Sequence, residues 1–144
     1  MKNNNYPTWL VPLEIAIELK EIGFNKKTMF YFFSADTTFK FSIYEDVHLD
    51  YILPIGDVEL DNYNRKGFYA SIPIWEQVFE WFREKGYHGV IAVKGEDGEN
   101  EYSYCIDYLN ELSSDFEQDS HLTYEEAREA LVKALIQTYK NEQL

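Results

Sequence analysis

The stretch that decides the fold runs from residue 73 to residue 106 and reads PIWEQVFEWFREKGYHGVIAVKGEDGENEYSYCI. Its first part places apolar residues at helical spacing and is followed by Gly86 as a stop signal, so the pattern predicts a helix over about 73–85. Two apolar and aromatic runs follow, at 88–93 and 102–106, and the Asp-Gly pair between them is typical of a tight hairpin turn. A helix followed by a β-hairpin predicts an α+β fold.

Two further helices flank this stretch. Residues 12–22 begin with a proline suited to a first turn, carry a wide apolar side and are followed by Gly23, which together predict a first helix. Residues 123–139 open with Thr123 and carry Glu126 three positions later. This spacing indicates a capping box, in which each side chain satisfies the free backbone N–H of the other residue. We therefore expect three helices.

The N-terminal half predicts more strands. Residues 29–33 are continuously apolar and aromatic, as in a central strand covered on both faces. Residues 39–43 alternate between apolar and polar, so the two runs would form a hairpin. The connection over 45–70 holds strand-like fragments between turn signals, and a connection this long is typical of a functional loop or a missed element. The complete prediction is one α+β domain over 1–144, with a mostly antiparallel sheet of four or five strands packed with three helices.

The order of elements resembles a duplication. Shifting the sequence by 63 residues aligns Gly23-Phe24 with Gly86-Tyr87 and also aligns the alternating runs 39–43 and 102–106. Both halves then read helix, strand, strand, so an α-β-β pseudo-repeat is one interpretation. The first strands of the two halves do not match at this offset, and such units also recur by chance.

The composition favours a folded protein in a reducing compartment. The chain has 144 residues, of which 45% are hydrophobic, and a net charge of -13. Its single cysteine, Cys105, permits no intramolecular disulfide. The N-terminus lacks the apolar region of a signal peptide, and no apolar run is long enough to cross a bilayer. We therefore expect a cytoplasmic protein.

The acidic residues concentrate in one segment. Between Gly95 and Ala127 there are eleven Asp or Glu residues and no Lys or Arg. Such a field repels phosphate backbones and anionic lipids, so we expect no direct binding of nucleic acid or membrane, whereas a basic protein would be attracted. The leading hypothesis is a non-enzymatic protein-binding module that uses the surface 95–126 on a basic partner and resembles DNA in its charge. The candidate partner-binding residues are Glu96, Asp97, Glu99, Glu101, Asp115, Glu117 and Asp119.

No motif for catalysis, metal binding or cofactor binding stands out. Cys105 lies in an alternating run that places it on the strand face opposite Tyr104 and Ile106, as a small strand residue. The sequence has no glycine-rich phosphate loop, no dinucleotide fingerprint and no helical histidine pair. We expect no cofactor and no metal, and the balance favours a protein that is not an enzyme.

Two alternatives stay open. The first is an enzyme or small-molecule-binding protein whose site lies in the 45–70 connection, where the polar groups are His48, Asp50, Tyr51 and Asp57. The second is a structural homodimer. The last helix carries a second apolar stripe beside its alanine-rich face, which would form a dimer surface if it were exposed. That stripe consists of Val132, Ile136 and Tyr139.

Three helical segments carry a resemblance to a known family. They are Pro12–Phe24, Pro73–Tyr87 and Tyr124–Ile136, each an amphipathic helix, the first two with their stop signals. In these segments the chain resembles a family of small acidic proteins of unknown function encoded in phages, prophages and mobile elements of gut Bacteroides-type bacteria. The family has no established activity, so the resemblance implies no catalytic residue.

Overall fold

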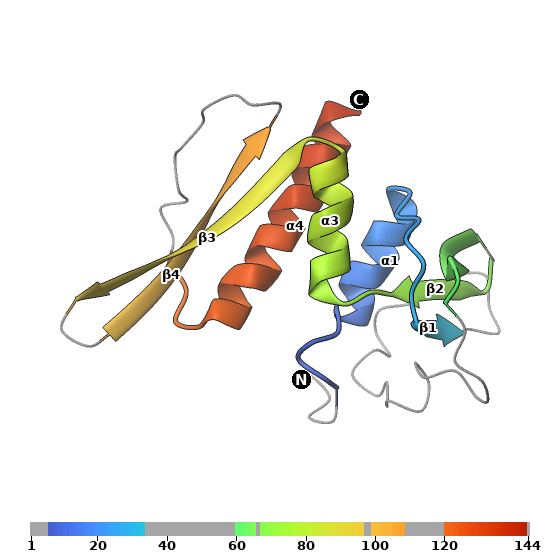
Figure 1. Cartoon of the computed structure of the whole chain (residues 1–144), viewed down its shortest axis with the longest axis horizontal. Coiled ribbons are helices and arrows are strands. Elements are labelled where there is room, and N and C mark those ends of the chain that lie inside the picture. Colours follow the sequence, from blue (N-terminus) through green and yellow to red (C-terminus); the bar gives the residue numbers. More distant parts are fainter. Residues whose placement is uncertain (1–5, 34–59, 66, 97–98, 109–119, 144) are drawn as a thin grey trace. The chain divides into compact units, whose positions relative to one another are not determined.

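The computed structural model of the chain has an α+β fold, as the sequence predicts (Figure 1). The residues that it describes are 6–33, 60–65, 67–96, 99–108 and 120–143. They fall into two compact units, formed from residues 1–77 and 78–144. None of the described helices combines the length and apolarity that a membrane span needs. The prediction of a single domain stays a prediction.

Helix α1, Leu13–Glu21, anchors the first unit, and the predicted helix over 12–22 is confirmed. Pro12 precedes it in extended backbone, and Gly23 follows it with a φ of 96°. Only glycine adopts this backbone conformation at little cost, which is why the helix ends there. The next residue, Phe24, is buried. The buried side of the helix consists of Leu13, Ile15, Ala16, Ile17 and Leu19.

The strands of the first unit pair differently from the expectation. Strand β1, Phe30–Phe33, pairs antiparallel with β2, Tyr69–Ile72. The expected hairpin partner, residues 39–43, lies outside the described residues. Strand β2 was not predicted, because its residues alternate neither in polarity nor in burial: Ala70 and Ser71 are both fully buried. The pattern of four residues therefore carries no period-two signal.

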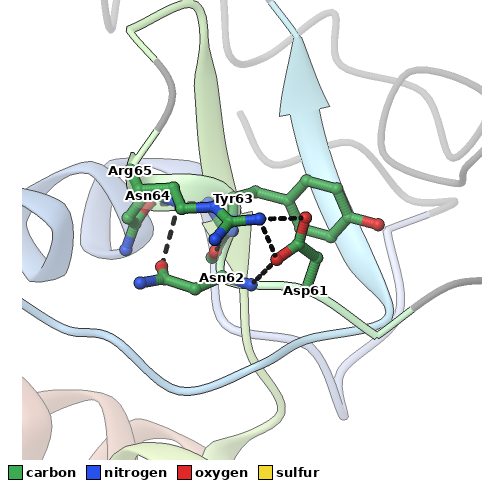
Figure 2. A network of polar contacts seen from close by, with 6 residues as sticks. Asp61, Asn62, Tyr63, Asn64 and Arg65 are labelled. Carbon is green, nitrogen blue, oxygen red and sulfur yellow. Dashed lines mark hydrogen bonds and ion pairs between the residues drawn. The ribbon is translucent and has the colours of Figure 1, made fainter.

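A polar connection precedes β2 and binds back onto the first unit (Figure 2). It contains the short 3-10 helix η2, Tyr63–Arg65. The Asn64 side chain donates to the Phe24 carbonyl over 2.9 Å and accepts from the Ser71 N–H over 2.8 Å. Ser71 in turn accepts from the Tyr63 N–H through its hydroxyl over 3.0 Å. Each of these bonds joins two segments of the backbone, so the network stabilises the fold.

The remaining elements begin with helix α3, Trp75–Glu84, which lies within the predicted 73–85 and ends before Gly86 at a φ of 93°. Strands β3, Tyr87–Glu96, and β4, Glu99–Tyr108, form the predicted antiparallel hairpin and are longer than expected. Helix α4, Tyr124–Glu142, follows. The Thr123 hydroxyl accepts from the Glu126 N–H over 3.1 Å, which is one half of the predicted capping box.

Helix α4 lies against the hairpin, as Figure 1 shows for the red helix and the yellow and orange strands. Gly89 of β3 makes this close approach possible, because a Cβ atom there would lie 2.9 Å from the side chain of Leu131. Near one end of the hairpin, the ring of Tyr139 on α4 contacts those of Tyr87, Trp81 and Phe82 in tilted or edge-to-face geometry, at ring-centroid distances between 5.3 and 6.3 Å. These aromatic residues build the core of the second unit, as their spacing suggests.

Two expectations need correction. Among the described residues the four strands form two separate two-stranded sheets, one in each unit, so a single sheet of four or five strands is more than the structure shows. The expected dimer surface on α4 is not exposed: Val132 and Ile136 are 0% and 1% exposed, and Tyr139 is half-buried among aromatic rings. The second apolar stripe of α4 is therefore explained by burial within the chain, because a helix that is covered on two sides carries apolar residues on both of them.

The two halves of the predicted α-β-β pseudo-repeat share one feature in the described residues, which is the way their helices end. Helices α1 and α3 both end at a glycine with positive φ that is followed by a buried aromatic residue, Phe24 or Tyr87. The second strand of the first repeat, at 39–43, lies outside the described residues. The duplication therefore stays a prediction.

Candidate protein-binding edge of the hairpin

The structure brings together three of the seven predicted partner-binding residues. Glu99 and Glu101 lie on β4 with exposed side chains, and Glu96 is the last residue of β3, directly opposite Glu99. The other four, Asp97, Asp115, Glu117 and Asp119, lie outside the described residues. The two-residue spacing between Glu96 and Glu99 agrees with the tight turn that the Asp-Gly pair predicts.

The end of the hairpin near this turn is exposed on both strands. Val93 is 58% exposed, and Lys94 and Gly95 beside it are exposed as well. On β4 the residues from Glu99 to Glu101 are all exposed. Lys94 lies opposite Glu101 in the register. The hairpin therefore presents a surface with an excess of negative charge at its turn and apolar residues behind it.

The direction of the backbone groups on β3 follows from a contact on β4. Tyr102 donates to the His121 carbonyl over 2.9 Å and accepts from the His121 N–H over 2.8 Å, so both of its backbone groups point away from β3. Tyr102 lies opposite Val93. In an antiparallel pair, two residues directly opposite each other are either both bonded to each other or both turned away from each other. When the backbone N–H and C=O of one residue point away from the partner strand, those of the opposite residue point away in the other direction. The N–H and C=O of Val93 therefore point to the outer edge of β3.

The same alternation applies along the whole strand. Gly89, Ile91 and Gly95 share the orientation of Val93, so their backbone groups also point to the outer edge. Among the residues that the structure describes, no strand pairs with this edge. Between Gly89 and Val93 the sequence has neither a charge nor a proline, and Val90 is 43% exposed. A long apolar edge of this kind is a template for pairing with another strand.

Sequence reasoning finds the strand, but not that its outer edge has no partner strand among the described residues. The apolar run over residues 88–93 indicates that a strand is present. Whether that strand lies at an edge depends on which other segment pairs with it, and no local pattern reports this. The absence of charge between Gly89 and Val93 is the one signal in the sequence, because edge strands are usually protected by charged residues.

The only cysteine gives little support to a catalytic site. Cys105 is buried, and burial, followed by the nearby charge of Asp107, raises the pKa of its thiol. A thiol with a raised pKa is mostly protonated at neutral pH and is a weak nucleophile. Because Gly89 faces α4 and lies opposite Ile106, strand alternation places Cys105 on the other face, as predicted. Within the described ranges, no group of three or more His, Cys, Asp or Glu residues could hold a metal ion.

The first unit contains one other predicted site and one cluster of exposed aromatic rings. The alternative site in the 45–70 connection rests on His48, Asp50, Tyr51 and Asp57, which lie outside the described residues. The outer face of the β1–β2 pair carries a cluster of aromatic rings, in which Phe33 contacts Tyr69 at 4.9 Å between ring centroids. Phe33 is half exposed. Aromatic rings by themselves indicate no particular ligand.

Comparison of the chain with protein-family models, with curated proteins and with solved structures finds no match.

Proposed function

We propose that this chain is a protein-binding module that recognises a basic protein through the turn end of the β3–β4 hairpin. The observation that carries the proposal is the exposed pair Glu99 and Glu101, at the end of two strands of ten residues each. Exposed carboxylates attract a basic surface from a distance of about 8 to 10 Å at moderate salt. A net charge of -13 adds a long-range attraction of the same sign.

Cys105 gives no support to the alternative of an enzyme with a cysteine nucleophile. Burial, followed by the nearby charge of Asp107, raises the pKa of the Cys105 thiol, so the thiol is a weak nucleophile. Binding through exposed charge needs no buried site and no cofactor. The resemblance to small acidic proteins of mobile elements stays a prediction beside this proposal.

The test is capture of partners from a lysate of the source cells by the tagged full chain, at low and at high salt. The same capture is repeated with a variant that carries both Glu99→Gln and Glu101→Gln. We expect a basic protein that is retained at low salt, released at high salt and bound roughly three- to tenfold more weakly by the double variant, since exposed charge pairs are each worth about 0.2–1 kcal/mol.

The matched control is Glu80→Gln with Glu84→Gln, which removes the same charge from exposed positions on α3. Equal weakening by the control would indicate that only net charge matters. If the hairpin variant retains its partners as strongly as the unchanged chain, the proposed function is wrong.

A further inference from the structure

The outer edge of β3 offers more than charge to a partner. Its four outward residues, Gly89, Ile91, Val93 and Gly95, each present one backbone N–H and one C=O in the plane of the hairpin. These groups repeat every second residue, which is the spacing of a neighbouring β-strand. The chemistry that satisfies such a row is an extended peptide backbone.

From this geometry we infer that the partner's docking element is an extended segment that adds to the hairpin as a third strand along β3. The inference rests on the proposed function and names the part of the partner that is bound. The segment would run beside residues 89–95, a length of about 23 Å at 3.3 Å per residue. Its main-chain hydrogen bonds supply the affinity, and its side chains supply the selectivity.

The exposed side chains of β3 define the composition of the segment. Val90 and Val93 are exposed on opposite faces of the strand. A partner strand lies about 4.8 Å from β3, so its own side chains contact these valines on both faces. β-branched residues such as Val, Ile and Thr fit this surface best. The middle of the segment is therefore apolar or β-branched.

The charge of the hairpin end places basic residues at one end of the segment. Glu101 and Glu99 lie on β4, two strand spacings from the added strand, which is about 10 Å. This distance is comparable to the Debye length at moderate salt, so their charge acts on Lys or Arg residues of the partner. Lys94 is the single positive charge among four negative ones between residues 94 and 101, so the net charge beside the turn is negative. The basic residues consequently lie beside the turn.

A second copy of the chain is a poorer occupant. Pairing β3 with β3 of another copy would bring together two chains that each carry a net charge of -13. Like charges of this size oppose association, whereas a basic segment is attracted. Self-pairing is therefore an outcome of the test that would overturn the inference.

The experiment uses the full chain labelled with nitrogen-15 and a nine-residue peptide in which Val and Thr alternate and two Lys residues occupy one end. Backbone amide signals are followed by NMR, together with their hydrogen exchange. In the free chain, the amides of Gly89, Ile91, Val93 and Gly95 should exchange faster than those of their neighbours that point to β4. On addition of the peptide, these four amides should shift and exchange at least tenfold more slowly.

Two changes separate backbone pairing from attraction between charges. In the chain, Val93→Pro removes an outward N–H without removing a bond to β4, and Val93→Thr is the matched control that keeps it. In the peptide, methylation of alternate backbone nitrogens blocks pairing and leaves the Lys residues unchanged, so this arm holds even if Val93→Pro fails to fold. We expect Val93→Pro and the methylated peptide each to weaken binding at least tenfold.

The outcomes distinguish this inference from the proposed function. If the methylated peptide binds as well as the original, or if no peptide perturbs β3 while Glu99→Gln with Glu101→Gln still weakens capture, the strand addition is wrong and the basic partner stands. If protection of the outward amides rises with chain concentration alone and sedimentation shows a dimer, the occupant is a second copy and the inference is overturned. If charge variants also leave capture unchanged, the proposed function fails independently.

Discussion

Asn64 is the residue whose replacement most directly tests how the first unit is held together. Its side chain joins the end of α1 to β2 through the Phe24 carbonyl and the Ser71 N–H. Ser71 is fully buried, so in an Asn64→Ala variant no water replaces the lost acceptor without rearrangement. Losing the bond to the Phe24 carbonyl costs about 1 kcal/mol, and leaving the buried Ser71 N–H without its acceptor costs about 1–3 kcal/mol. We expect the variant to lose about 2–4 kcal/mol of unfolding free energy.

Arg65→Ala is the control within the same connection. Arg65 forms an ion pair with Asp61 at 3.0 Å, which Figure 2 shows beside Asn64, but its side chain is mostly exposed. An exposed ion pair between residues four positions apart contributes about 0–1 kcal/mol. Because the contact that Arg65→Ala removes is exposed, we expect a much smaller loss of unfolding free energy than for Asn64→Ala. Asn64→Asp keeps an acceptor for the Ser71 N–H and should fall between the two.

The assay combines urea unfolding followed by circular dichroism with hydrogen exchange at the Ser71 amide. Exchange is the local readout, because two compact units need not unfold in a single transition. The reasoning predicts that Ser71 exchanges much faster in Asn64→Ala and almost unchanged in Arg65→Ala. Losses of equal size in the two variants would refute the role given to the Asn64 bridge.

Four further predictions follow from single contacts. Thr123→Ala should destabilise α4 by about 1 kcal/mol, measured by thermal unfolding, because the Glu126 N–H loses its acceptor, and Thr123→Ser should restore it. Gly23→Ala should lower the free energy of unfolding by about 1 kcal/mol because Gly23 has a positive φ, although an added Cβ atom meets no other atom there. Gly67→Ala is the control: its Cβ atom also meets no other atom, and because Gly67 has no positive φ, the substitution should not destabilise the protein. Leu131→Ala should cost about 2–5 kcal/mol in urea unfolding because it empties the space beside Gly89; a loss below 1 kcal/mol would contradict this packing. The Cys105 thiol should react with iodoacetamide with a pH midpoint above that of a free cysteine, and a midpoint at or below the free value would contradict its burial. Because the pKa of this thiol is raised in the folded state, its contribution to stability should be present at neutral pH and should decline as the pH rises above about 8.5.

The helices could be predicted because their signals are local. A glycine with positive φ after α1 and α3, and a threonine followed by a glutamate at the start of α4, act on backbone groups within one turn. The hairpin of β3 and β4 was found for the same reason, since a two-residue turn brings neighbouring segments together.

The pairing of β1 with β2 could not be predicted in this way. It joins Phe30 to Ile72 across more than forty residues of sequence. Any of several apolar segments has the right pattern to pair with β1, and the choice depends on what else is buried. Asn64 illustrates the point, because its amide bonds two segments that are remote from each other, yet in the sequence it is one more polar residue in a turn.

By itself, the sequence of this protein determined the class of the fold, the three helices, the β3–β4 hairpin and the acidic character of its turn, although α4 extends to Glu142, beyond the predicted end at 139. These features depend on hydrogen bonds and periodicities within a few residues, and on charges that can be counted. Only the tertiary structure decided that Val132 and Ile136 are covered, that β2 pairs with β1, and that the outer edge of β3 has no strand beside it among the described residues. Each of these depends on which distant segment meets a given surface, because burial and strand pairing are properties of two surfaces and a local pattern describes only one of them.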